Sequence, residues 1–333
     1  MKKIGLTTTV PIEVIIAKGY SPVDINNLFI SDTDYLKYID IAESDGFPKS
    51  SCAWIKGIYG VCITHGIDEI VGVVEGDCSN TRALIEVLSS KGIKIHTFSY
   101  PHSHSLQALE REIKRFADGF GVDMNSVENV RNRLNGIRKL AKQIDELTYI
   151  NGKATGFENH IYQVSMSDLQ ADEFVYEEEL KHAIDEISKR DSRKPKLRLG
   201  YIGVPPMTGD IYSFVEGFNA GFVYNEVQRE FAFPRADKAK NIFEQYYDYT
   251  YPYSLEFRLK EIQEQIRNRE IDAIIHYTQA FCYRAIEDIV IRESLQIPIL
   301  NIEGDKLNRL DARTKLRLEA FLDMLYDAKE SKQ

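Results

Sequence analysis

The stretch IDEIVGVVEGDCSNTRALIEVLSSKGIKI, residues 67–95, decides the fold. Its first part is rich in Ile and Val and predicts a buried strand, SNTRALIEVLSSKG predicts a helix, and Ile-Lys-Ile starts a further strand. Strand, helix and strand in this order form a βαβ unit, which is the building block of parallel sheets. The segment therefore predicts an α/β fold, with Cys78 at the point where a core strand gives way to a helix.

The same pattern recurs in the second half of the chain as IDAIIHYTQAFCYRAIEDIVIRESLQIPI, residues 271–299. In both copies a cysteine lies ten residues after an aspartate, which places Cys282 in the position of Cys78. The openings also match, because IGLTTTVP at 4–11 resembles LGYIGVPP at 199–206. This internal repeat predicts two similar parallel-sheet domains of the flavodoxin or Rossmann type.

Four parts of the chain follow from this repeat. Residues 1–105 are expected to form the N-terminal α/β domain, and 196–305 the C-terminal one. Residues 106–195 place apolar side chains three and four apart, which predicts a helical connecting region with a polar linker at its end. Residues 306–333 are expected to form a closing C-terminal helix.

Composition excludes several functional classes. The 333 residues carry 42 Lys and Arg against 51 Asp and Glu, a net charge of −9, which argues against a nucleic acid or an anionic membrane as partner. No run approaches the roughly 18 apolar residues of a membrane span, and the N-terminus lacks an apolar signal region. We therefore expect a cytoplasmic protein whose four cysteines do not form disulfides.

Three of these cysteines share one local setting. Cys78 and Cys282 follow core strands, Cys52 follows the helix-capping candidates Ser50 and Ser51, and all three are expected at helix starts, where backbone amides favour a thiolate. Each alone is more often a core residue than a ligand. Three thiols without matching histidines suit an iron–sulfur cluster better than zinc. Cys62 falls on another face of its helix and is expected in the core.

Other residues carry weaker signals. Thr8 and Thr9 at the end of the first strand are candidates for substrate binding, or are ordinary β-branched strand residues. The tyrosine-rich stretch at 243–254 lines a pocket or an interface, or more simply packs in a core. Gly57-x-x-Gly60 is too weak a signal for a phosphate loop.

In order along the chain, five motifs resemble those of the 2-hydroxyacyl-CoA dehydratase and benzoyl-CoA reductase family. They are VPIEVIIAKGYSPVDI at 10–25, CAWIKGIYG after residue 51, GDCSNTR around Cys78, AFCYRA around Cys282, and IPILNIEGD followed by RTKLRLEAFLDML. The resemblance covers nearly the whole chain. The chain is shorter than typical subunits of that family, and TTTVP replaces a stretch that is more aromatic in many of them, so the substrate pocket is expected to differ.

This resemblance implies one [4Fe–4S] cluster between two flavodoxin-like domains, with Cys52, Cys78 and Cys282 as its ligands. It also implies radical dehydration or reduction of an acyl-CoA, with the electron supplied by a separate ATP-dependent iron–sulfur activator, and a homo- or heterodimer with a related subunit. Glu13 becomes a candidate for substrate contact or proton transfer, against the alternative of a glutamate that serves the helix dipole.

Three hypotheses about function remain open. The first is a lyase or low-potential reductase of this family, acting on an acyl-CoA or a similar small substrate. The second is a reductase or accessory protein of the same fold that acts without CoA, because no CoA-specific motif is visible. The third is a cluster-free scaffold subunit, which retention of all three candidate ligands disfavours.

Overall fold

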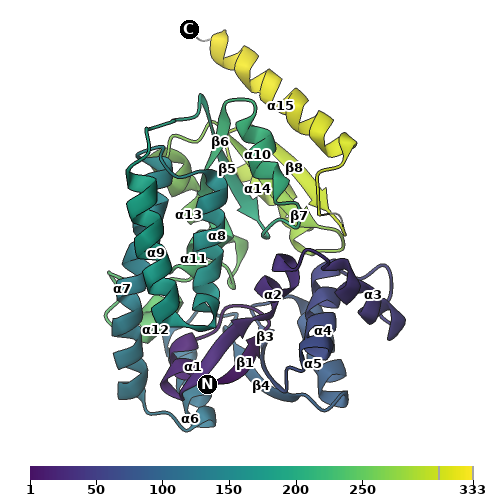
Figure 1. Cartoon of the computed structure of the whole chain (residues 1–333), viewed down its shortest axis with the longest axis vertical. Helices are drawn as coiled ribbons and strands as arrows, with labels where there is room; N and C mark the ends of the chain where they lie inside the picture. Colours follow the sequence, from purple (N-terminus) through teal and green to yellow (C-terminus); the bar gives the residue numbers. More distant parts are fainter. Residues whose placement is uncertain (307, 332–333) are drawn as a thin grey trace. The chain divides into compact units, whose positions relative to one another are not determined.

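Two compact units make up the chain, and each is built around one parallel sheet. Figure 1 shows the computed structural model, which describes residues 1–306 and 308–331. Unit 1 comprises residues 1–141, 164–181 and 230–254. Unit 2 comprises residues 142–163, 182–229 and the described residues from 255 onward. Each unit is therefore assembled from three separate stretches of sequence.

The sheet of unit 1 has four parallel strands in the order β2-β1-β3-β4. Its strands are β1 (Lys2–Leu6), β2 (Tyr20–Asp24), β3 (Glu69–Glu75) and β4 (Lys94–Ser99). Its helices are α1 (Ile12–Ala17), α2 (Ile25–Ser31), α3 (Leu36–Ser44), α4 (Ala53–His65), α5 (Ser79–Ser90), α6 (Leu106–Phe120) and α12 (Ile242–Tyr247).

The sheet of unit 2 repeats this order as β6-β5-β7-β8, also fully parallel. Its strands are β5 (Leu197–Gly203), β6 (Ala220–Asn225), β7 (Ala273–Gln279) and β8 (Ile299–Gly304). Its helices include α10 (Asp210–Glu216), α13 (Leu255–Asn268), α14 (Arg284–Ser294) and α15 (Ala312–Glu330). The shared strand order confirms the predicted fold class of two similar parallel α/β sheets.

Alternation along the strands of unit 2 explains why helices cover both faces of its sheet. Leu199 and Tyr201 of β5 pack in a core with Leu318 and Leu322 of α15. Ile202, by contrast, belongs to a second core on the other face, and that core includes residues of α13 and α14. Successive side chains of a strand point to opposite faces, so one strand feeds both cores.

Residues 106–195, which the sequence predicts to be helical, do form helices. Besides α6 they contain α7 (Met124–Tyr149), α8 (Gly156–Val164), the 3-10 turns η1 (Ser165–Ser167) and η2 (Leu169–Ala171), and α9 (Glu173–Ser188). These elements are divided between the two units, and α7 and α9 each contribute to both. A further short helix, α11 (Glu226–Phe231), also continues from unit 2 into unit 1.

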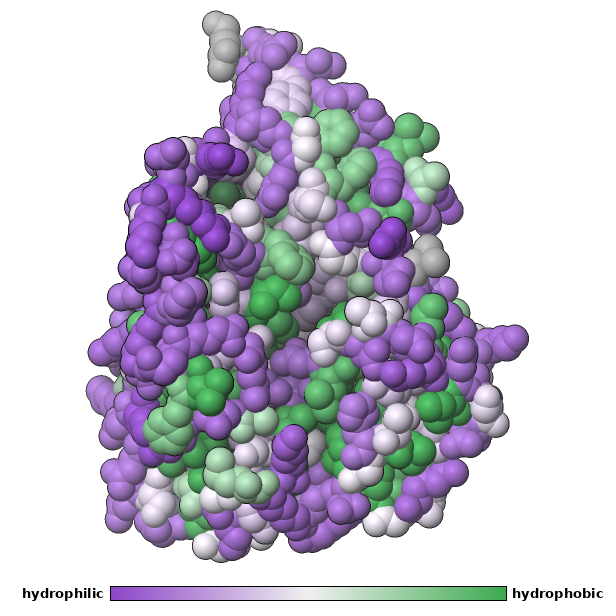
Figure 2. All heavy atoms as spheres, viewed as in Figure 1, coloured by the Kyte–Doolittle hydropathy of each residue, from purple (hydrophilic) through white to green (hydrophobic). Residues whose placement is uncertain are grey.

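The visible surface of the described residues is largely polar. Among the described residues, no helix combines the length and the apolar character that crossing a membrane requires. The face shown in Figure 2 is largely hydrophilic, with apolar side chains scattered between charged ones.

Two glycines of α4 have a packing role. A Cβ at Gly57 would lie 2.4 Å from the ring of Phe29 in α2, and one at Gly60 would lie 2.2 Å from the backbone oxygen of Tyr38 in α3. Both glycines therefore let α4 approach its neighbours closely. This packing explains the Gly-x-x-Gly spacing, which was too weak a signal to predict a phosphate loop.

Candidate functional site

The carboxyl edge of the sheet in unit 1 gathers the segments that follow β1, β3 and β4. The amide of Tyr100, just after β4, donates to the carbonyl of Glu75 at 2.9 Å, and the Tyr100 hydroxyl donates to the carbonyl of Thr9 at 2.9 Å. Between β3 and α5, Gly76 adopts a φ of 89°, and a Cβ there would lie 2.7 Å from Tyr100. Ligands of open parallel α/β sheets bind at this edge.

Cys78 occupies the N-cap of α5 at this edge. Its sulfur accepts a hydrogen bond from the amide of Asn80 at 3.4 Å, and the side chain is partly exposed. The next turn is fixed by Thr81, whose hydroxyl donates to Asp77 at 3.0 Å. An N-cap sulfur faces unpaired amides and the positive end of the helix dipole, which favours a thiolate.

Cys52 is the N-cap of α4, and its side chain is 7% exposed. The sequence places the cap at Ser50 or Ser51 and Cys52 in the first turn, and this is wrong by one or two residues. Ser51 instead closes a turn, because its amide and its hydroxyl both donate to the carbonyl of Pro48. The helices α4 and α5 contact each other and lie side by side in Figure 1. Since α4 returns the chain to the amino edge, where β3 starts, its N-terminal Cys52 lies at the carboxyl edge, where β3 ends and Cys78 caps α5.

Cys62 lies in the core of unit 1. It is 1% exposed, and burial raises the pKa of its thiol to about 12. A thiol that stays protonated in an apolar environment is a poor ligand. The predicted core position is confirmed.

Cys282 follows β7 in unit 2 and is partly exposed. Its amide donates to the carbonyl of Gln279 at 3.0 Å, and Phe281 before it adopts a φ of 64°. The sequence predicts a helix start at Cys282. Because of this turn, α14 begins two residues later, at Arg284. Burial raises the pKa of the Cys282 thiol, while the backbone and the guanidinium of Arg284 act in the opposite direction.

The three cysteines thus fall into two groups. The structure brings Cys52 and Cys78 to one edge in unit 1, and it places Cys282 at the equivalent edge in unit 2, since β3 and β7 hold the same place in the two sheets. None of the three forms a disulfide. Within residues 1–306 and 308–331, no three His, Cys, Asp or Glu side chains are gathered around one metal position.

Glu13 lies in the first turn of α1 and is fully buried. Its carboxylate accepts hydrogen bonds from Arg138 at 2.6 Å, from Gln245 at 2.9 Å and from the Tyr246 hydroxyl at 2.8 Å. Although burial opposes ionisation, Arg138 and these donors hold the pKa of Glu13 below its usual range. Glu13 is therefore an ionised residue that ties α1 to α7 and α12.

The loop that follows β1 is held by tyrosine hydroxyls. Tyr246 donates to the carbonyl of Val10, next to the Tyr100 bond to Thr9 described above. Thr9 is 3% exposed, and its hydroxyl has no hydrogen-bond partner among the described residues. Thr8 is the more exposed of the two predicted threonines. Substrate binding by either threonine stays a prediction.

Sequence reasoning missed the partners of Glu13, because they come from distant segments. Arg138 belongs to α7, while Gln245 and Tyr246 belong to the tyrosine-rich stretch at 243–254. The high tyrosine content of that stretch was the one sequence feature that pointed to any of these partners. Tyr246, Tyr249 and Tyr253 of this stretch are buried in unit 1, which confirms core packing as their main role.

A buried pair of carboxyl side chains, Asp24 and Asp168, adjoins a strained turn in unit 1. Asp168 accepts hydrogen bonds from the amide of Asp24 at 2.7 Å and from the amide of Gln170 at 3.0 Å. The residues of η2, 169–171, all adopt a positive φ although none is glycine. Such residues cost about 1–2 kcal/mol each, so the turn depends on the contacts that hold it.

This pair predicts that unit 1 loses stability as the pH rises from about 4 to about 7. Burial, and next the Asp24 carboxylate, raise the pKa of Asp168 from 3.8 to about 7. The folded state therefore holds a proton that the unfolded chain has released, and the resulting stability disappears as the pH passes through the raised value. We expect a change on the order of 1–3 kcal/mol. Urea titrations monitored by Trp54, the one tryptophan, report on unit 1.

Asp168→Asn should remove most of this pH dependence, while Asn at the exposed Asp118 should leave it in place. An unchanged slope in Asp168→Asn would contradict the assignment.

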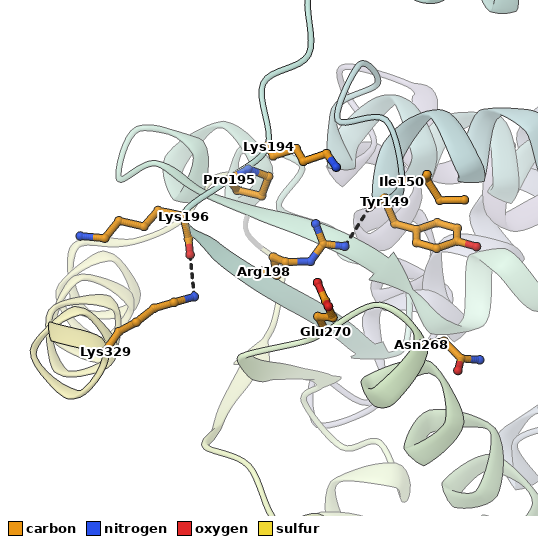
Figure 3. Close-up of a pocket in the computed structure, with 9 residues that line it drawn as sticks. All are labelled: Tyr149, Ile150, Lys194, Pro195, Lys196, Arg198, Asn268, Glu270 and Lys329. Atoms are coloured by element: carbon orange, nitrogen blue, oxygen red, sulfur yellow. Dashed lines mark hydrogen bonds between the residues drawn. The ribbon is translucent and has the colours of Figure 1, made fainter. Parts of the chain in front are cut away.

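Figure 3 shows a pocket of about 470 Å³ in unit 2, at the amino edge of its sheet. It is lined by Tyr149, Ile150, Lys194, Pro195, Lys196, Arg198, Asn268, Glu270 and Lys329. Arg198 donates to the carbonyls of Tyr149 and Arg269, and Lys329 pairs with Asp272. These two cations are thus bound within the chain, and the pocket lies away from the strand ends that precede Cys282.

A family model described as 2-hydroxyglutaryl-CoA dehydratase, D-component, matches residues 7–325. The chain belongs to this family. The match includes all three cysteines at the carboxyl edges and Glu13, and it confirms the family resemblance predicted from the motifs. A search of curated proteins found no match. Membership in the dehydratase family makes this chain a component of the 2-hydroxyacyl-CoA dehydratase type.

Proposed function

We propose that the chain is an iron–sulfur subunit of a dehydratase or reductase that acts on a 2-hydroxyacyl-CoA or a similar small thioester. The observation that carries this proposal is the placement of three cysteines, none in a disulfide, at the carboxyl edges of the two sheets, within the region matched by the dehydratase family. Cys52 and Cys78 both cap helices, and Cys282 precedes one.

The donor chemistry of these residues fits a [4Fe–4S] cluster. Thiolates are the usual ligands of such clusters, and three from this chain would leave one iron open. At the N-cap of α5, the Cys78 sulfur accepts an amide hydrogen bond, which favours its thiolate form. Cys52 holds the N-cap position of α4 without such a bond, and buried Cys62 is unsuited to the role of a ligand. When bound, the cluster would supply one-electron transfer and a Lewis-acidic iron for the substrate.

The remaining residues of the edge in unit 1 would bind and orient the substrate. The loop after β1 carries Thr8 and Thr9, and Tyr100 and Tyr246 hold its backbone in place. The buried ion pair of Glu13 and Arg138 fixes the start of α1, so we assign Glu13 a positioning role in this site. An ATP-dependent activator as electron donor, a related partner subunit and a cytoplasmic location complete the proposal.

Iron and sulfide analysis of anaerobically purified protein tests this proposal. We expect about four irons per chain, lost in Cys52→Ala, Cys78→Ala and Cys282→Ala. The control is Cys62→Ala, which removes a cysteine of the same helix as Cys52 and should keep the iron. Wild-type protein that holds no iron even after reconstitution would overturn the proposal and favour a cluster-free subunit.

A further inference from the structure

A network of four charged side chains in unit 2, three of them buried and Glu287 partly exposed, ends at the helix that follows Cys282. Its members are Glu226 at the start of α11, Arg258 of α13, and Glu287 and Arg284 of α14. Arg258 is fully buried, and Glu226 and Arg284 are 2% and 3% exposed. Charges are rarely buried without a structural or functional reason.

Hydrogen bonds and ion pairs connect all four side chains of this network. Arg258 binds Glu226 through two nitrogens, at 2.8 and 3.0 Å, and it also donates to Glu287. Arg284 binds the same Glu287 at 3.2 Å. Glu226 in turn accepts the amide of Gly203 at the end of β5, at 2.9 Å. This network of charged side chains thus anchors the first turn of α14 to the carboxyl edge of the sheet.

Arg284 is the cation of this network whose charge acts directly on Cys282. It is the first residue of α14, two residues after Cys282, and its side chain is held by the pairing with Glu287. A buried charge acts more strongly on its neighbours than an exposed one, because little water screens it. A cation fixed here therefore stabilises negative charge at Cys282.

We propose that Arg284 is a positioning residue that raises the reduction potential of an iron–sulfur cluster bound by Cys282, and that Glu287 moderates this effect. The inference rests on the proposed function above. Reduction adds one electron to the cluster, and a nearby cation favours the more negative product. The pairing with Glu287 offsets part of the positive charge and keeps the guanidinium in place.

The test is a redox titration with dithionite, followed by EPR, of the iron-loaded full chain. We expect Arg284→Met to lower the potential, and Glu287→Gln to raise it, each by about tenfold in the one-electron equilibrium, or 59 mV. Arg284→Lys should stay close to the wild type. The matched control is Arg292→Met, which removes a half-exposed arginine that pairs with Asp288 on the same helix and should cause no shift.

Opposite shifts of the reduction potential in Arg284→Met and Glu287→Gln support a charge effect. Structural damage to α14 would move both potentials in the same direction. Equal shifts, or none, in protein that retains its iron would overturn this inference and leave the proposed function standing. Wild-type protein without iron would overturn both.

Discussion

Replacing Arg138 with methionine is expected to destabilise unit 1 by about 3–5 kcal/mol. The substitution leaves the Glu13 carboxylate fully buried without its cationic partner, with the neutral side chains of Gln245 and Tyr246 still donating to it. The cost of an uncompensated buried charge exceeds that of a lost surface contact. Urea unfolding followed by Trp54 fluorescence measures the effect, because Trp54 belongs to unit 1.

Arg133→Met is the matched control for this prediction. Arg133 lies on the same helix, pairs with Glu173 at 2.6 Å and is exposed, so its removal should cost no more than about 1 kcal/mol. Adding Glu13→Gln to Arg138→Met should restore part of the stability, because the double variant buries no unpaired charge. Equal effects of Arg138→Met and Arg133→Met would contradict the assigned role of the buried pair.

Gly60→Ala is expected to destabilise unit 1 by about 3 kcal/mol. The added Cβ would meet the backbone oxygen of Tyr38 at 2.2 Å and its Cα at 2.6 Å. Backbone atoms of a packed helix cannot turn aside as a flexible side chain can, so α3 and α4 must separate. Trp54, on α4 itself, reports the loss in the same urea titrations.

Gly136→Ala makes the same chemical change in α7, where no heavy atom lies within 4 Å of the added Cβ. It should stabilise the protein by about 0.5–1 kcal/mol, because alanine restricts the unfolded chain and favours the helix. The two substitutions should therefore have opposite signs. A stabilisation of similar size at both positions would show that helix propensity, and not the contact between α3 and α4, decides the outcome.

The sequence by itself determined the α/β class, the internal repeat and the position of three of the four cysteines near the start of a helix. These features depend on local patterns: a run of Ile and Val, a helical spacing of apolar residues, and a cysteine at the boundary. The repeat at 67–95 and 271–299 was visible because both copies obey the same local rules. Where local prediction was wrong, at the caps near Cys52 and Cys282, tight turns displaced the helix starts by one or two residues.

Only the tertiary structure decided which distant residues meet. Glu13 meets Arg138 and Gln245 across 125 and 232 residues of sequence, and Asp24 meets Asp168 across 144. The chain builds each unit from three separate stretches, so these pairs depend on where it returns to a unit, which no local pattern encodes. Burial then sets their chemistry, because a carboxylate without water keeps its charge only beside an arginine and takes up a proton beside a second carboxylate.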